Sequence, residues 1–204
     1  MFAFDARTGD PIWRWEPDPE AGRVPSWQGV VLGDGLVFFG TRSAEVIALD
    51  QDTGELVWAT RVGSEARTRG ESVTTAPMYA RGKVFVGLAN GDTGGQGRVL
   101  ALDAATGAIE WTFFVVPRPG EFGHDTWPQD NDSWEFGGGG VWLVGTVDPD
   151  WAGEIGLAGL QLRSCGGECS PARRFEGLDR TGPLPESGPV RTLEGPDLVP
   201  VIRA

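Results

Sequence analysis

Short apolar runs alternate with turn dipeptides along the first half of the chain. The stretch GVVLGDGLVFFG has two apolar runs around Asp34-Gly35, and APMYARGKVFVG repeats this arrangement around Arg81-Gly82. Runs of this length, rich in Val and Phe and separated by such dipeptides, are typical of β-hairpins. The pattern therefore predicts short antiparallel strands, with no long helix between residues 24 and 116.

A repeated motif divides this region into units. Residues 3–13, 48–58 and 101–111 all fit the pattern A-x-D-x-x-T-G-x-x-x-W, and its Asp positions are 45 and then 53 residues apart. A four-stranded propeller blade has a similar repeat of roughly 40 to 50 residues. In each copy the Asp and Thr favour a tight turn, and the Gly supplies a positive φ. We interpret each copy as the third strand, turn and fourth strand of a blade. Its last residue would pack between neighbouring blades: Trp13, Trp58 and Trp111.

Counting strands from this motif gives the predicted fold. The chain starts at the third strand of one blade, crosses two complete blades at about 27–62 and 74–116, and enters a fourth near Val141. After that the alternation fades, and the end of the chain is rich in Pro, Gly and charge, a composition that favours loop or disorder. The prediction is an all-β sector of a propeller over 1–150, with roughly two complete four-stranded blades plus partial blades. An irregular or disordered tail is expected over 151–204.

Composition and charge exclude several classes of protein. The 32 Gly, 15 Pro and 9 Trp residues give a turn-rich composition far from that of a helical bundle. The formal net charge of −12 opposes binding to nucleic acids or anionic membranes, which attract clustered Lys and Arg. No apolar run approaches the roughly 18 residues of a transmembrane helix, and the N-terminal sequence lacks the features of a secretory signal. We therefore expect no nucleic-acid partner, no transmembrane segment and no signal peptide in the chain as given.

Two groups of reactive side chains stay outside the repeat. Cys165 and Cys169 in CGGEC have neither the spacing of a haem attachment site nor the companions of a zinc site. Unpaired thiols and a small-loop disulfide are both compatible with this sequence. His124 is the single histidine and has an ordinary pKa near neutrality, but a lone His in a polar loop is more often a surface residue than a catalytic one. Three carboxylates share its loop, at a spacing that matches no calcium motif: Asp125, Asp130 and Asp132.

These motifs resemble those of the PQQ (pyrroloquinoline quinone)-dependent quinoprotein dehydrogenases, eight-bladed propellers such as the bacterial methanol and alcohol dehydrogenases. The resemblance covers about residues 3–149 and includes the three motif copies, which are the tryptophan-docking motifs of that family. It implies an oxidoreductase acting on a small alcohol, with PQQ and Ca²⁺ as cofactors. It also implies a periplasmic location and an electron acceptor such as a cytochrome c or a quinone.

The first stretch that resembles the family's cofactor pocket is GLANGDTGGQG, residues 87–97. The family pattern is G-x-x-G-A-E-x-G-x-R-G, in which the small residues approach the quinone and the Glu binds calcium. The resemblance places Asp92 at the calcium-ligand position, and Asn90 and Gly91 at the small-residue positions. Aspartate keeps a hard oxygen ligand but has a shorter reach than glutamate. The alternative interpretation is a glycine-rich hairpin loop with one exposed Asp.

The second stretch, residues 132–150, resembles the pattern W-x-x-G-G-G-x-x-W-x-x-x-x-x-D-P. The family's second Trp, which forms the floor under the quinone, falls on Trp142, and Gly140 replaces a Thr that contacts the cofactor. The alternative for Trp142 is ordinary packing between blades. The TTAP stretch also matches, and it offers the hydroxyl of Thr74 or Thr75 to a cofactor carboxylate.

Several positions depart from the family. Gln28 in WQG replaces an Arg that pairs with cofactor carboxylates, a loss worth about 1.5 to 3 kcal/mol. The family's adjacent-cysteine disulfide would fall at Gly22-Arg23 and is absent, and nothing after Asp150 matches the calcium-binding Asn or the catalytic Asp. The catalytic residues are thus unknown. We interpret the chain as a piece of a longer quinoprotein-like parent, inactive by itself. The alternative is a non-catalytic propeller that acts as a protein-interaction scaffold.

Overall fold

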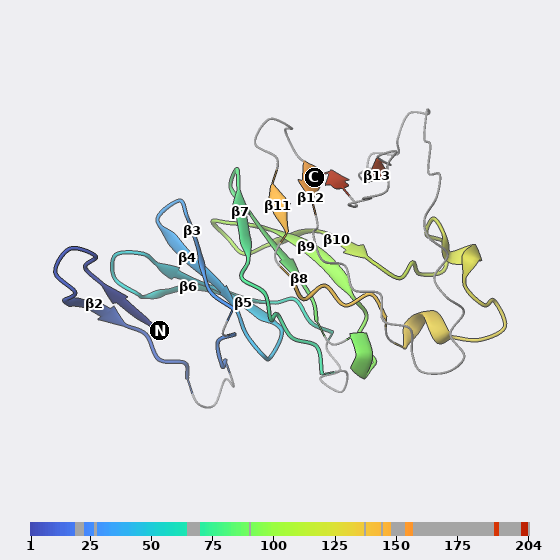
Figure 1. Ribbon diagram of the computed structural model, residues 1–204, viewed down its shortest axis with the longest axis horizontal. Coiled ribbons are helices and arrows are strands. Elements are labelled where there is room, and N and C mark those ends of the chain that lie inside the picture. Colours follow the sequence, from blue (N-terminus) through green and yellow to red (C-terminus); the bar gives the residue numbers. More distant parts are fainter. Residues whose placement is uncertain are drawn as a thin grey trace.

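The computed structural model contains β-strands and short 3-10 helices over the part of the chain that it describes (Figure 1). The described residues are 1–18, 23–26, 28–64, 70–89, 91–136, 138–143, 145–147, 154–156, 190–191 and 201–203. Among them, no helix has the length and apolar character needed to cross a bilayer.

A two-stranded sheet opens the chain. Strand β1 (Phe2–Phe4) pairs antiparallel with β2 (Pro11–Arg14). Two four-stranded antiparallel sheets follow it. The first contains β3 (Val31–Gly33), β4 (Leu36–Gly40), β5 (Glu45–Asp50) and β6 (Leu56–Arg61). The second contains β7 (Met78–Ala80), β8 (Lys83–Gly87), β9 (Arg98–Asp103) and β10 (Ile109–Phe114).

Within these two four-stranded sheets, strands that are consecutive in sequence are also neighbours in space. This is the order predicted for propeller blades. Over 24–116 the described residues contain one 3-10 turn, η2 (Gly91–Thr93), and no long helix. The all-β prediction with four-stranded units is therefore confirmed.

A fourth sheet begins a few residues after Val141, where the sequence predicts a further blade. Its strand order is β11 (Thr146–Val147), β12 (Glu154–Gly156), β14 (Val201–Arg203) and β13 (Val190–Arg191). Strand β11 also contacts β7 of the preceding sheet. Within the predicted tail the structure describes only β12 to β14. The rest of that tail, including Cys165 and Cys169, lies outside the described residues.

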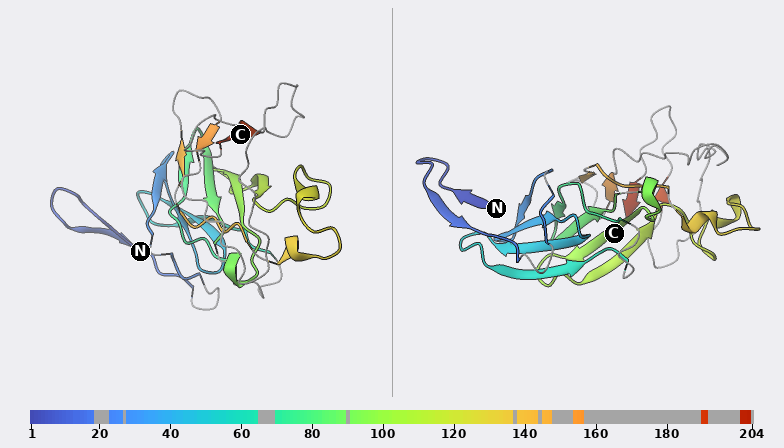
Figure 2. Two further views of the ribbon diagram at one scale, coloured as in Figure 1. Left: turned by 45° about the vertical axis from the view of Figure 1, so that its right-hand side comes forward. Right: turned by 90° about the horizontal axis from the view of Figure 1, so that it is seen from below.

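The sheets lie in a row, with the β1–β2 hairpin at one end (Figures 1 and 2). At the opposite end projects the connection between β10 and the fourth sheet, which carries η3 (His124–Thr126) and η4 (Ser133–Glu135). His124 Nδ1 lies 3.0 Å from the carbonyl oxygen of Pro117, and its ring packs edge-on against Trp134. The single histidine is thus part of the packing of this connection.

The three motif copies fold into the same turn. In the second copy, the Asp50 carboxylate accepts hydrogen bonds from the N–H and the hydroxyl of Thr53, at 2.8 and 3.0 Å. In the third, Asp103 accepts the same pair from Thr106. In the first, Asp5 accepts from two main-chain N–H groups of its turn. Hydrogen bonds to the charged form favour ionisation. The pKa of each of the three carboxyls therefore lies below its ordinary value of 3.8.

Two of the motif tryptophans join one sheet to the next. Trp13 Nε1 donates to the carbonyl oxygen of Gln51 at 2.8 Å, and Trp58 Nε1 donates to that of Ala104 at 3.0 Å. Gln51 and Ala104 occupy the same position in the motif, directly after its Asp. The last strand of one sheet is thus bonded to the turn of the following sheet in the same way twice.

Trp111, the third motif tryptophan, has different surroundings. Its ring lies 6.0 Å from that of Phe85 in its own sheet, and it packs in a cluster with Val99 and Val141. Its Nε1 is buried and has no hydrogen-bond partner in the described part of the chain.

The apolar core lies between the sheets. One cluster fills the space between β3–β6 and β7–β10, where Phe38 packs on Trp58 and stacks parallel to Tyr79 at 6.0 Å. A second cluster places Phe39 against Trp15, between the β1–β2 sheet and β3–β6. Each sheet therefore depends on its neighbour for burial, as expected of a propeller sector.

Candidate functional site

The connection between β8 and β9, residues 87–97, lies against the glycine run that precedes β11. Gly138 N donates to the carbonyl oxygen of Gly91 at 2.9 Å, and Val141 N donates to that of Leu88 at 2.8 Å. These two bonds join the stretches in which the sequence predicts a cofactor pocket. The long connection is thus packed against the following segment.

Glycine is required at this junction by close approach of the two main chains. A Cβ atom built on Gly91 would lie 2.9 Å from both the carbonyl oxygen of Gly138 and the N of Gly140. One built on Gly97 would lie 1.7 Å from the carbonyl oxygen of Gly139. Any larger residue would force the two segments apart.

Asp92 and Trp142 stand on the two segments that meet here. Asp92 is an exposed residue of η2, next to Gly91. Trp142 directly follows Val141 and keeps 38% of its surface exposed. The predicted metal ligand and the predicted aromatic floor therefore lie on two segments that are hydrogen-bonded to each other. Asn90 lies outside the described residues.

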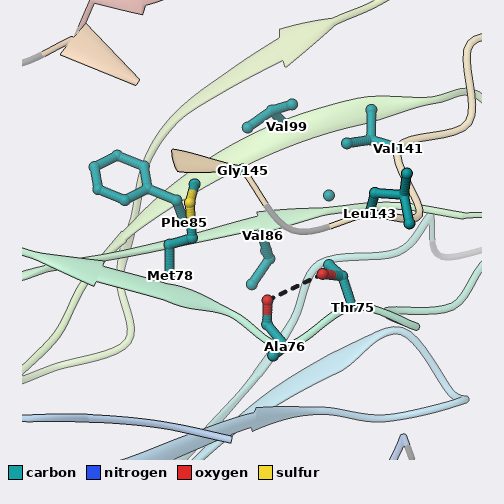
Figure 3. Close-up of a pocket in the computed structure, with 10 residues that line it drawn as sticks. Thr75, Ala76, Met78, Phe85, Val86, Val99, Val141, Leu143 and Gly145 are labelled. Atoms are coloured by element: carbon teal, nitrogen blue, oxygen red, sulfur yellow. Dashed lines mark hydrogen bonds between the residues drawn. The ribbon is translucent and has the colours of Figure 1, made fainter. Parts of the chain in front are cut away.

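The TTAP stretch is close to the same junction. Thr75 is buried and lines a small pocket, whose walls also come from the segment around Trp142 (Figure 3). The other pocket side chains drawn there are apolar: Ala76, Met78, Phe85, Val86, Val99, Val141 and Leu143. Since the Thr75 hydroxyl donates to the carbonyl oxygen of Ala76 at 3.1 Å, it is already engaged within the protein.

Thr74 has the free hydroxyl of the pair. Its Oγ1 is buried and has no hydrogen-bond partner among the described residues. Its carbonyl oxygen accepts a hydrogen bond from Ser26 Oγ at 2.6 Å, and a Cβ on Gly29 would lie 3.8 Å from that of Ala76. The segment that carries the exposed Gln28 thus runs beside TTAP. Of the two threonines that the sequence offers, Thr74 is the better donor to a ligand.

Comparison with known proteins fixes the family. The family model described as "Outer membrane protein assembly factor BamB" matches residues 2–126. The chain belongs to this family. It is also 33% identical to the quinoprotein alcohol dehydrogenase PedH of Pseudomonas putida, over 74% of this chain and 28% of that protein. The dehydrogenase subunit of the quinone-dependent alcohol dehydrogenase of Gluconobacter oxydans is 35% identical, over 73% of this chain and 23% of that protein.

The fold is also similar to that of a solved quinoprotein structure. The europium-containing methanol dehydrogenase superposes with a TM-score of 0.64 and 27% identity, over 76% of this chain and 30% of that one. The predicted resemblance to the PQQ-dependent alcohol and methanol dehydrogenases, over part of the chain, is thus confirmed. The chain spans about a quarter of the length of the curated relatives that it matches.

The described residues of this family member supply groups of the kind that suit a flat, anionic cofactor such as PQQ. Trp142 offers a partly exposed indole, Thr74 a buried hydroxyl without a partner among the described residues, and Gln28 a neutral amide. A calcium ion fits less well, because the described residues contain no group of three or more His, Cys, Asp or Glu side chains able to hold a metal. Asp92 by itself is one ligand of the six to eight that Ca²⁺ takes.

The sequence interpretation missed one feature beside the site, a buried ion pair between Glu71 and Arg98. The Arg98 Nη2 lies 3.2 Å from the Glu71 Oε2. The signal that was available is the charged residue at the first position of the third strand, in EVIALD and in RVLALD. Its partner is far away in sequence, so the pair is visible only in the folded chain.

Proposed function

We propose that this chain is part of a PQQ-dependent, alcohol dehydrogenase-like quinoprotein and forms one sector of its cofactor pocket. The junction of 87–97 with the glycine run carries the proposal, because it joins the segment of a carboxylate, Asp92, to the segment of a partly exposed indole, Trp142. The length of the chain relative to its relatives supports the view that other parts of the pocket come from elsewhere in a longer parent.

Each residue has a distinct role in this proposal. Trp142 supplies the rigid face on which the flat cofactor lies. The Thr74 hydroxyl and the Gln28 amide donate hydrogen bonds to cofactor carboxylates, and the glycines Gly91 and Gly140 allow close approach. Asp92 contributes one hard oxygen ligand to Ca²⁺.

When bound, PQQ supplies the capacity to accept two electrons and a proton equivalent from an alcohol. The protein contributes binding, orientation and electrostatics to that chemistry. A catalytic base and further calcium ligands are expected from other parts of the parent. We also propose a periplasmic location and an electron acceptor such as a cytochrome c or a quinone. The contacts of Trp13 and Trp58 between sheets are proposed to be tryptophan-docking contacts.

The test compares this chain with a version extended by the coding sequence that flanks it. Both proteins are titrated with PQQ and Ca²⁺ while tryptophan fluorescence and dye-linked alcohol oxidation are followed. We expect stoichiometric quenching and oxidation only in the extended protein, and loss of both in Trp142→Ala and Asp92→Asn. Trp15→Phe, which replaces an indole packed on Phe39 between the first two sheets, is the control. An extended protein that binds no PQQ would refute the proposal. Stoichiometric binding by the present chain, lost in Trp142→Ala, would contradict the view that its site is incomplete.

A further inference from the structure

A charge pair lies at the base of the connection between the second and third strands in both complete sheets. In β3–β6, Glu45 opens β5 and its Oε2 lies 3.5 Å from the Arg23 Nε. In β7–β10, Arg98 opens β9 and pairs with Glu71. The acidic and basic partners have exchanged places between the two sheets. Both sheets therefore have an ion pair at the start of the third strand, although the residue types at the two positions are reversed.

The second pair is the more buried and the more extensively bonded. The side chains of Arg98 and Glu71 are 7% and 5% exposed, against 27% and 16% for Arg23 and Glu45. The Glu71 Oε2 also accepts a hydrogen bond from the Ser64 hydroxyl at 2.8 Å, and Arg98 donates to the carbonyl oxygen of Val62 at 3.0 Å. The pair thus ties the start of β9 to the segment that follows β6.

This pair brackets the connection that carries Asp92. The carbonyl oxygen of Arg98 accepts a hydrogen bond from Leu88 N at 2.9 Å, which closes the base of the connection. Ser72, directly after Glu71, accepts one from Ala89 N at 2.9 Å. Both ends of the connection are therefore fastened by residues at or beside the ion pair.

Stability alone does not explain a charged residue at position 71. Burying an ion pair costs desolvation that its attraction does not always offset, so such a pair is weak evidence for stabilisation. The second carboxylate oxygen, Glu71 Oε1, is buried and has no hydrogen-bond partner in the part of the chain that the structure describes. Glutamine keeps an oxygen that can accept these bonds but loses the negative charge that strengthens the bond from Arg98. Glu71→Gln therefore weakens the pair while keeping a side chain of the same size.

We propose that Glu71 and Arg98 are a positioning pair, which holds the 87–97 connection and Asp92 against the glycine run at Gly138–Gly140. Neither residue contacts the cofactor; each acts through the connection. The placement of Asp92 for calcium binding rests on the proposed function. The attachment of the 87–97 connection by this pair, called the clamp below, is independent of the proposed function.

Hydrogen exchange on the full chain tests the clamp without any ligand. Glu71→Gln is compared with Glu45→Gln, the same change in the corresponding pair of the preceding sheet. The reporters are four amides whose bonds hold the connection: Leu88, Ala89, Gly138 and Val141. We expect Glu71→Gln to accelerate their exchange about tenfold, with amides of β5 unchanged. Glu45→Gln should leave the four reporters at their wild-type rates. Unchanged reporters in Glu71→Gln, or equal acceleration throughout the chain, would overturn the proposal.

Arg98→Lys provides a second variant if Glu71→Gln fails to fold. Lysine keeps the charge but lacks the guanidinium fork that reaches two acceptors, so the same local acceleration is expected. Global acceleration, or none, would again refute the positioning role.

Calcium titration of the extended protein in the presence of PQQ separates this inference from the proposed function. Weaker calcium binding in Glu71→Gln, with wild-type binding in Glu45→Gln, supports both. Local acceleration of exchange in a protein that binds no PQQ supports the clamp and refutes the function. Weaker calcium binding with unchanged exchange contradicts the clamp.

Discussion

The indole of Trp58 lies directly over the main chain of Gly107 in the following sheet. A Cβ built on Gly107 would be 2.6 Å from the ring, while the Trp58 Nε1 donates to the nearby Ala104 carbonyl oxygen. Gly54 has the same relationship to Trp13. The corresponding glycine of the first motif copy, Gly9, has nothing within 4 Å of its Cβ position. Gly9 is therefore a control for the contacts that Gly54 and Gly107 make with an indole.

Replacement of these glycines by alanine should separate backbone strain from packing. Gly9 and Gly107 both have positive φ, +79° and +72°, so either alanine costs about 1 to 2 kcal/mol of conformational energy. Gly107→Ala also meets the Trp58 ring and the Thr60 Oγ1, each 2.6 Å from the Cβ position, which should add about 1 to 3 kcal/mol of overpacking. Urea unfolding curves measure both. Equal losses of stability in the two variants would show that the contacts of Gly107 with Trp58 and Thr60 contribute little.

The tryptophans themselves should differ in the same assay. Trp58→Phe removes a buried donor and leaves the Ala104 carbonyl oxygen without that partner, which should cost about 1 to 3 kcal/mol in addition to the lost volume. Trp111→Phe removes a buried Nε1 that bonds to nothing in the described residues. We therefore expect Trp111→Phe to lose less stability than Trp58→Phe. A larger loss in Trp111→Phe would indicate an acceptor for Trp111 outside those residues.

The turn carboxylates should make stability depend on acid pH. For Asp103, hydrogen bonds from the Thr106 hydroxyl and N–H lower the pKa of the folded state below 3.8. A lowered folded-state pKa stabilises the fold above the unfolded-state pKa, and this stabilisation is lost as the pH falls through the folded-state value. Asp103→Asn should therefore be less stable than wild type at pH 7 and should lose less stability on acidification below about pH 4.

Thermal unfolding over a pH series measures this effect. Asp52→Asn is the matched control, because Asp52 contributes its main-chain N–H, and not its carboxylate, to the bond that closes its turn. The control should retain the acid dependence of the wild type. Parallel pH profiles for wild type and Asp103→Asn would contradict the prediction.

The sequence alone determined the strands, the turns and the family, because these depend on patterns that are local in the chain. Alternating apolar residues select strands, and the Asp, Thr and Gly of the motif close a turn within a few residues of one another. The motif interval then predicted four-stranded sheets, and the resemblance placed Asp92 and Trp142 in a common pocket region.

Only the tertiary structure decided which side chains are available there. The sequence offered Thr74 and Thr75 equally, and the fold engages Thr75 with Ala76 while leaving the Thr74 hydroxyl without a partner in the described residues. The charge of Arg98 at the start of its strand is visible in the sequence, but its partner Glu71 is not, because 27 residues separate the two. Hydrogen-bond partners and burial depend on which sheets pack together, and the information for that packing is spread over the whole chain and is absent from any single motif.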